Sequence, residues 1–193
     1  MSIHYSEKLN EIITNVFEPK FLEYGFSRSK NVFKRKIDGV LQQCSIQKSR
    51  ANSSIFASFY VSVGIYHHTF AKIRGLKQSE SLLFSIPLQE LVEKAFQKKT
   101  YLDWYCMGDI PGLTPYGGIS EATFDLEDPF TRYDRVWKDP SKLIYILQQD
   151  IDFCIVPFFE ATSTEEKLVR FVEVNDYNLF LSQLGRQFID EKS

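Results

Sequence analysis

The sequence predicts an α+β fold, with an antiparallel sheet of about five to six strands, helices packed mainly on one face and a helical C-terminus. Residues 55–66 (IFASFYVSVGIY) alternate with a period of two, which is typical of a strand. Residues 37–40 (IDGV) place Asp-Gly between two β-formers, as a two-residue hairpin requires. Beyond residue 139 the apolar residues instead recur at helical spacing.

The length and composition fit one domain. A chain of 193 residues with 44% apolar and 25% charged residues can bury a sizeable core, so we expect a single domain over 1–193, sheet-rich in 26–137 and helical in 139–190. No run approaches the roughly 18 apolar residues of a membrane span. The N-terminal sequence MSIHYSEKLNEI lacks a signal-peptide pattern, so we predict a cytoplasmic protein that does not bind membranes.

The first helix is predicted from an apolar stripe over residues 9–17. Pro19 removes a backbone donor, so it is expected to kink or restart this helix. Gly25 suits the position just past the helix end, and Phe26 begins the sheet.

The Asp-Gly turn fixes the register of the hairpin that follows. With residues 37 and 40 opposite each other, Phe33 pairs with Cys44 and Arg35 with Gln42, on a face that is otherwise apolar. Two interpretations of Arg35 stay open. In the first, the helix layer is thin here and the side chain either extends out of the core or pairs with a carboxylate; in the second, Arg35 is a buried or cleft arginine that binds an anion.

The strand over 55–66 has two different faces. Its odd positions are all apolar and should meet the helices, and the strand should pair antiparallel with residues 41–49. Its even positions carry three aromatic rings, at Phe56, Tyr60 and Tyr66, separated by Ser and Gly. That face is either covered by another layer or forms the floor of a groove.

The rest of the chain gives weaker local signals. The patterns predict a loop (69–81), a helix starting at Pro87, a strand (101–107), a Gly- and Pro-rich loop (108–120) and two strands (121–126 and 131–137). A loop as long as 108–120 is either functional or a simple insertion.

The C-terminal helices carry recognisable caps. Asp139 and Pro140 suit the N-cap and first helical positions, and Pro157 should end or bend this helix. Ser163 with Glu166 forms the pattern of a capping box, and Asn175 or Asp176 is expected to cap the last helix.

No motif indicates a metal or a cofactor. Cys44, Cys106 and Cys154 are about fifty residues apart, unlike a zinc site or a disulfide framework. His67 and His68 are neighbours on a strand and so point to opposite faces. Glycine-rich nucleotide-binding motifs and the G-x-S-x-G motif of serine hydrolases do not occur. We therefore expect no cofactor and no metal.

Charge is unevenly distributed along the chain. Residues 1–118 hold 15 Lys and Arg against 10 Asp and Glu, whereas residues 119–193 hold 8 against 15. The basic excess is greatest in residues 28–50. This segment is either a solvated hairpin face or a surface for an anionic partner or for the acidic tail itself.

Two stretches resemble a known family. FLEYGFSRSKNVFKRKIDGVLQQCSIQKSR (21–50) has a helix ending in Gly-Phe, a basic strand, a turn and a strand ending Gln-Lys-Ser, and DIDFCIVPFFEATSTEEKL (150–168) runs through a Pro into an aromatic pair. Both are similar to a bacterial family of domains of unknown function, numbered 4304. The resemblance implies an α+β order and a bacterial origin, and it assigns no activity and no functional residue.

We predict a non-catalytic binding protein, with immunity-like masking of a protein partner as one form of this function. Its groove is expected on the even face of 55–66, together with the Gly- and Pro-rich loop. The candidate binding residues are Tyr60, Tyr66, Trp104, Arg35, Tyr116 and Arg132. A protein partner or a small-molecule ligand would occupy it.

Two alternatives stay open. A hydrolase-type enzyme could use a carboxylate site, for which the candidates are Asp103, Glu121, Asp125, Glu127 and Asp128. A binder of single-stranded nucleic acid could stack bases on Tyr60 or Tyr66 beside Lys34 and Lys36. The net charge of −2 and the lack of a known module disfavour nucleic acid.

Overall fold

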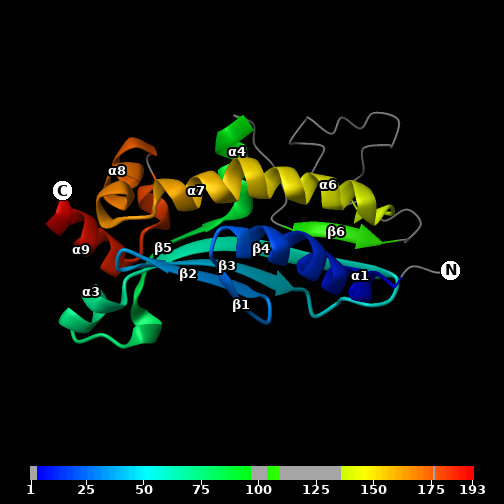
Figure 1. Ribbon diagram of the computed structural model, residues 1–193, viewed down its shortest axis with the longest axis horizontal. Coiled ribbons are helices and arrows are strands. Elements are labelled where there is room, and N and C mark those ends of the chain that lie inside the picture. Colours follow the sequence, from blue (N-terminus) through cyan, green and yellow to red (C-terminus); the bar gives the residue numbers. More distant parts are fainter. Residues whose placement is uncertain (1–3, 97–103, 109–135, 176) are drawn as a thin grey trace.

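A mostly antiparallel sheet of seven strands forms the centre of the computed structural model, which describes residues 4–96, 104–108, 136–175 and 177–193 (Figure 1). The strands are β1 (Ser27–Ser29), β2 (Val32–Ile37), β3 (Val40–Lys48), β4 (Phe56–Tyr66), β5 (Leu82–Pro87), β6 (Trp104–Gly108) and β7 (Val136–Trp137). Their order is β1-β2-β3-β4-β6-β7, and β5 also pairs with β4. The predicted α+β class is confirmed, with more strands than expected and one parallel pair, β6 with β7.

The strand at the centre of the sheet is β4. One of its edges pairs with β3 from Phe59 to Tyr66, and the other is shared between β6, opposite Phe56–Tyr60, and β5, opposite Ser62–Tyr66. The prediction that the alternating stretch is a strand next to residues 41–49 is therefore confirmed. Ile55 is an exception, because it precedes the strand and its side chain is 58% exposed rather than in the core.

The β2–β3 hairpin follows the predicted register. Asp38 and Gly39 have φ angles of 46° and 83°, and positive values at both central residues define the type I′ turn. Ile37 therefore pairs with Val40, and Arg35 with Gln42.

Most of the helices cover one face of the sheet. The helices are α1 (Tyr5–Ile12), α2 (Glu18–Glu23), α3 (His68–Ile73), α4 (Leu88–Phe96), α6 (Pro140–Asp150), α7 (Val156–Ala161), α8 (Glu165–Asn175) and α9 (Gln183–Lys192). Figure 1 shows α1, α6 and α7 running across the same face, whereas α3 lies at the other side, at one end of the sheet. Leu9 and Phe17 from the first helices, Leu147 and Ile155 from the later ones, and Phe59 of β4 belong to one buried core.

Both long helices contain the same irregularity before a proline. Segments η1 (Ile13–Phe17) and η5 (Ile151–Ile155) are π-helical, and each leads into a short α-helix with Pro19 or Pro157 at its second residue. A proline ring clashes with the carbonyl four residues earlier in a regular helix, and the wider π turn relieves this clash. The helix therefore neither ends nor restarts at Pro19 or Pro157, because a π turn lets it continue past each proline.

The two helices also bury many matching positions, 138 residues apart. The matched buried pairs are Leu9 and Leu147, Ile12 and Asp150, Ile13 and Ile151, Val16 and Cys154, Phe17 and Ile155, and Phe21 and Phe159. Only one pair replaces an apolar residue with a charged one. Asp150 is fully buried, and its Oδ2 accepts a hydrogen bond of 2.8 Å from the hydroxyl of Tyr105.

The expected loop over 69–81 is wrong, because these residues belong largely to α3 and to a 3-10 turn over Gln78–Glu80. His67 caps α3 through its Nδ1, which accepts from the backbone N–H of Phe70. Gly75, with φ of 70°, ends it, and the N–H of Leu76 donates to the carbonyl of Ala71. Six residues are too few for a periodic apolar pattern to reveal such a helix.

Two predicted caps are also wrong. Thr164 rather than Ser163 caps α8, by accepting from the N–H of Lys167, and the hydroxyl of Ser163 donates to the carbonyl of Glu160. Ser182 caps the last helix through the N–H of Gly185. The predicted caps at Asp139 and Gly25 are confirmed.

The β5 strand was not predicted, and its free edge is covered. Ser182 donates its N–H to the carbonyl of Leu83 and its hydroxyl to that of Leu82, and Leu181 forms a bridge with Phe84. Pro87 is the last residue of this strand rather than the first of α4. The predicted strand over 121–126 and the loop beyond Gly108 lie outside the described residues.

Candidate functional site

The side of the sheet opposite the helices carries the rings predicted to line a groove. We call it the open face and define it by the outward side chains of three strands. These are Val32, Lys34 and Lys36 of β2, Leu41, Gln43, Ser45 and Gln47 of β3, and Phe56, Ser58, Tyr60, Ser62, Gly64 and Tyr66 of β4. Register places them in rows, for example Lys34 beside Gln43 and Gln43 beside Gly64.

Burial distinguishes the two faces of β4. Ala57, Phe59, Val61, Val63 and Ile65 on the helix side are at most 1% exposed. On the open face the three aromatic residues are only half-buried, and Gln47 is exposed. In the part of the chain that the structure describes, no helix lies over this face, and α3 stands at its end (Figure 1).

Tyr66 makes the most defined contacts of the open face. A Cβ at Gly64 would lie 3.2 Å from Cε2 of Tyr66, so the missing side chain at Gly64 gives the ring its place against the strand. The Tyr66 oxygen accepts a hydrogen bond of 3.2 Å from Nε2 of Gln43, which also donates to Ser45 at 2.8 Å. Burial raises the pKa of Tyr66, so its hydroxyl stays protonated at neutral pH.

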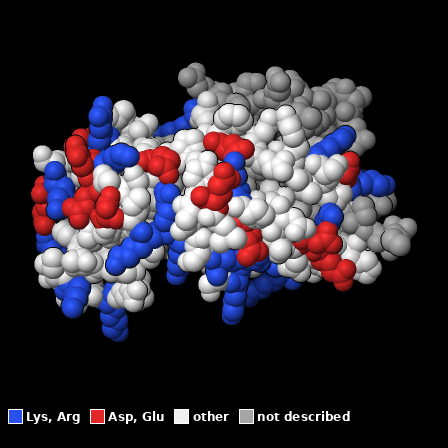
Figure 2. Space-filling view, viewed as in Figure 1, with Lys and Arg blue, Asp and Glu red and all other residues white. Residues whose placement is uncertain are grey.

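The open face is basic. It includes Lys34 and Lys36, both exposed, and no Asp or Glu occurs among its residues as defined above. Figure 2 shows basic side chains projecting from the lower edge of the molecule, below β1 and β2. Burial lowers the pKa of His68, and the nearby positive charges of Lys36 and Lys34 lower it further. The side chain of His68 is therefore neutral at physiological pH.

Both of the two adjacent histidines form hydrogen bonds with other side chains of the protein. His67 is buried, and because its Nδ1 accepts from Phe70, its Nε2 carries the hydrogen and donates to Oε1 of Glu165 at 2.7 Å. His68 contacts Ser81 through Nδ1 at 2.6 Å. Across the described ranges, no three His, Cys, Asp or Glu side chains are grouped so that they could hold a metal ion.

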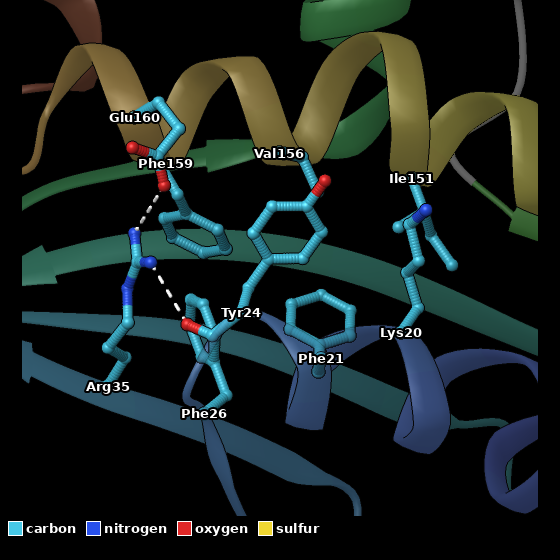
Figure 3. Close-up of a pocket in the computed structure, with 9 residues that line it drawn as sticks. All are labelled: Lys20, Phe21, Tyr24, Phe26, Arg35, Ile151, Val156, Phe159 and Glu160. Carbon is cyan, nitrogen blue, oxygen red and sulfur yellow. Dashed lines mark hydrogen bonds and ion pairs between the residues drawn. The ribbon is translucent and has the colours of Figure 1, made fainter.

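Arg35 points away from the open face, toward the helices (Figure 3). Its Nε donates to Oε1 of Gln42 at 2.9 Å, one terminal nitrogen donates to the carbonyl of Tyr24 at 3.0 Å, and the other pairs with Glu160 at 3.0 Å. The guanidinium carbon lies 4.9 Å from the centre of the Phe26 ring. The first interpretation from the sequence, pairing with a carboxylate, is confirmed.

Gln42 completes this connection between sheet and helix. It is fully buried, and its Nε2 donates to the carbonyl of Phe159 at 2.5 Å, near the end of α7. A carbonyl at a helix C-terminus lacks an intrahelical donor, so Gln42 supplies one. The polar pair in an otherwise apolar face is therefore structural.

A crevice lies beside Arg35, between α2 and the η5–α7 segment (Figure 3). Its walls are mostly apolar and lie so close together that they leave no space for a water molecule. Ion pairs of 2.7 Å between Lys20 and Asp152, and of 3.0 Å between Arg35 and Glu160, join the two walls.

The structure brings together some of the predicted site residues and separates others. Tyr60 and Tyr66 share the open face, and the backbone of Trp104 lies opposite Tyr60 in β6, although its side chain lies outside the described part. Arg35 is on the other side of the sheet. Tyr116 and Arg132 lie outside the described residues, as do the carboxylates proposed for a hydrolase, Asp103, Glu121, Asp125, Glu127 and Asp128.

Gln43 is the residue of this site that the sequence interpretation missed. The hairpin register already placed it next to Lys34 on the outward side, and β3 next to β4 places it beside Gly64. Its position was therefore readable from the sequence. Its hydrogen bond to Tyr66 could not be predicted in this way, because Gln43 and Tyr66 are not directly opposite each other: Gln43 pairs with Gly64, and Tyr66 with Leu41.

No helix within the described ranges has the length and apolar character needed to cross a bilayer. This agrees with the absence of a long apolar run in the sequence.

Comparison with known proteins gives one match. Residues 17–83 match the model of a family described as "Domain of unknown function (DUF4304)". No curated protein and no solved structure matches the chain. The second stretch of the expected resemblance, residues 150–168, lies outside the matched segment, whereas every residue of the open face lies inside it. The part of the chain that carries the open face is thus similar to a family of domains of unknown function.

Proposed function

We propose that this protein is a non-catalytic binding protein and that the open face is where it docks a protein partner. The observation that carries the proposal is the half-buried rings on a sheet face that no described helix covers. A large aromatic side chain at the centre of a surface is a common anchor of protein interfaces. An immunity-like role, in which the chain masks its partner, is the specific form that we propose.

The arrangement of charged pairs supports the open face over the helix side as the docking surface. Two arginines on the helix side of the sheet have partners within the chain, since Arg28 pairs with Glu18 and Arg35 with Glu160. Lys34 and Lys36 have no ion pair with a described residue. A docking surface needs charged groups that remain available to pair with a partner, and Lys34 and Lys36 are such groups.

Site-specific photo-crosslinking tests the proposal in cells that natively produce the protein. A photoreactive phenylalanine analogue replaces Gln47 on the open face or, as the matched control, Tyr145, which is 48% exposed on α6. We expect a discrete adduct from position 47 only, competed by unlabelled protein. The cross-linked protein, once identified and purified, should form a stoichiometric complex and lose its own activity in it.

Two results would contradict the proposal. Equal adducts from both positions would indicate nonspecific contact, and a lack of any competed adduct at position 47 would exclude docking there. The protein encoded next to this chain is the first candidate to test. A bacterial origin, cytoplasmic location, a single domain over 1–193 and the hydrolase alternative stay predictions from the sequence.

A further inference from the structure

We infer that the partner presents carboxylate groups, and that Tyr66, Lys34 and Lys36 together form the subsite that binds them. The inference rests on the proposed function, since it names the chemistry of the partner that docks on the open face.

The first step is the hydroxyl of Tyr66. Its oxygen accepts from Gln43, so the geometry leaves its hydrogen directed elsewhere, and no described residue accepts it. Because burial raises the pKa of Tyr66, this hydrogen is retained at neutral pH. The phenol is therefore a donor that no described residue accepts from, and an ionised oxygen such as that of a carboxylate accepts from it more strongly than a neutral oxygen does.

The second step is the position of the two lysines. Register aligns Lys36 with Leu41 and Leu41 with Tyr66, so Lys36 and Tyr66 are two strands apart, about 10 Å between Cα atoms. Lys34 follows on the same face of β2, about 7 Å from Lys36. A lysine side chain is long enough to bring its ammonium group most of the way across these distances. Two ammonium groups and one phenol can thus surround one or two carboxylates.

The charges of the open face favour an acidic protein over other partners. With no acidic side chain on the open face, an approaching anion meets no repulsion there, and His68 at its end is neutral. A second copy of the same face would bring lysines against lysines, which disfavours self-association through it. A nucleic acid would need a longer series of cations to follow its phosphates than the two lysines of the open face provide. An acidic protein surface therefore fits best.

Titration followed by backbone amide NMR tests the inference on the full chain. The probe is a decaglutamate peptide, and a ten-residue oligothymidylate is the comparison. We expect decaglutamate to shift the amides of Lys34, Lys36, Gln43 and Tyr66, with salt weakening the effect. The variant Lys34→Glu/Lys36→Glu should lose these shifts. The control Lys142→Glu/Arg186→Glu, with the same change of charge on exposed helix positions, should keep them.

A finer variant tests the phenol. Tyr66→Phe keeps the ring and removes the donor, so we expect the affinity for decaglutamate to fall about two- to tenfold. An unchanged affinity would exclude the hydroxyl from the subsite. Oligothymidylate binding at the same amides and at lower concentration would overturn the inference in favour of nucleic acid.

The two proposals fail in different ways. If neither probe shifts the open-face amides while the cross-link from position 47 still forms, a protein docks on the open face without using carboxylates. The inference is then wrong and the proposed function stands. If the cross-link fails as well, both are wrong.

Discussion

Gln42 shows how a single buried polar residue can hold two layers together. Its amide donates to the carbonyl of Phe159 and its oxygen accepts from Arg35, so both ends of the side chain are used. Burying such groups without partners costs free energy, and here the cost is offset by bonds that fix the sheet against α7. The sequence located Gln42 on the apolar face correctly. It did not reveal the carbonyl 117 residues away that explains it.

Replacement of Gln42 by Leu should destabilise the protein. The change leaves the Phe159 carbonyl and the Nε of Arg35 without their partners, so we expect the free energy of unfolding to fall by about 1–3 kcal/mol. Urea denaturation measures it. Gln47→Leu, on the same strand but exposed, should change stability by less than about 0.5 kcal/mol. Equal effects of the two substitutions would show that the buried bonds of Gln42 contribute nothing.

Among the secondary-structure elements, α9 depends on a glycine for its contact with the sheet. A Cβ at Gly185 would lie 2.0 Å from the carbonyl oxygen of Leu83, far inside contact distance. The helix therefore approaches the edge of β5 through its backbone. Covering this edge also removes a free strand edge that could pair with other chains.

Gly185→Ala should be destabilising even though Ala is the better helix former. Helix propensity alone would stabilise the variant by about 1 kcal/mol, whereas the clash with a backbone oxygen should cost about 1–3 kcal/mol or more. Thermal or urea unfolding measures whether the variant is less or more stable than the parent protein. Gln187→Ala, at an exposed position of the same helix, is the control and should be close to neutral. A stabilised Gly185→Ala variant would contradict the contact with Leu83.

Glu165 connects three helices and should make stability depend on pH. Its carboxylate pairs with Lys192 of α9 at 2.7 Å and accepts from His67, the cap of α3. Hydrogen bonds from Lys192 and His67 lower the pKa of Glu165 below its ordinary value of 4.5. The stabilisation is therefore complete above that value and is lost as the pH falls through the lowered pKa.

The test compares the free energy of unfolding of the parent protein and Glu165→Gln between neutral pH and pH 3. We expect the parent to be more stable at neutral pH and the difference to shrink as the pH falls below about 4.5. Glu166→Gln, at the exposed neighbouring position, should follow the parent. A difference that stays constant with pH would show that the charge of Glu165 is not what connects these helices.

Sequence patterns succeeded for elements that local chemistry determines. The Asp38-Gly39 turn, the alternating β4 and the Asp139 cap each follow from residues that are close in the chain. α3 and β5 were missed for a physical reason. α3 is short and is held by a histidine cap, and β5 is held partly by Leu181 and Ser182, which are distant in sequence.

At the scale of the whole molecule, the two faces of the sheet have different roles. The helix face stabilises the fold, and the open face is where we propose that a partner binds. The helix face contains the core, the Arg35–Glu160 pair and a crevice too narrow for water. Among the described residues, the open face carries half-buried rings, no acidic side chain, and two lysines that form no ion pair with a described residue. The alternation of residues in β2, β3 and β4 predicted this division, but the partner of the open face depends on a molecule that the sequence does not contain.

The most direct test of this division is thiol labelling of native protein carrying Ser45→Cys, in a Cys106→Ser background. Ser45 lies on the open face between Val32 and Ser62, whereas Cys44 and Cys154 are buried and serve as internal controls. If the open face is accessible, position 45 should react with iodoacetamide under native conditions while Cys44 and Cys154 react only on unfolding. Protection of position 45 equal to that of Cys44 would contradict the account, because the open face would then be covered.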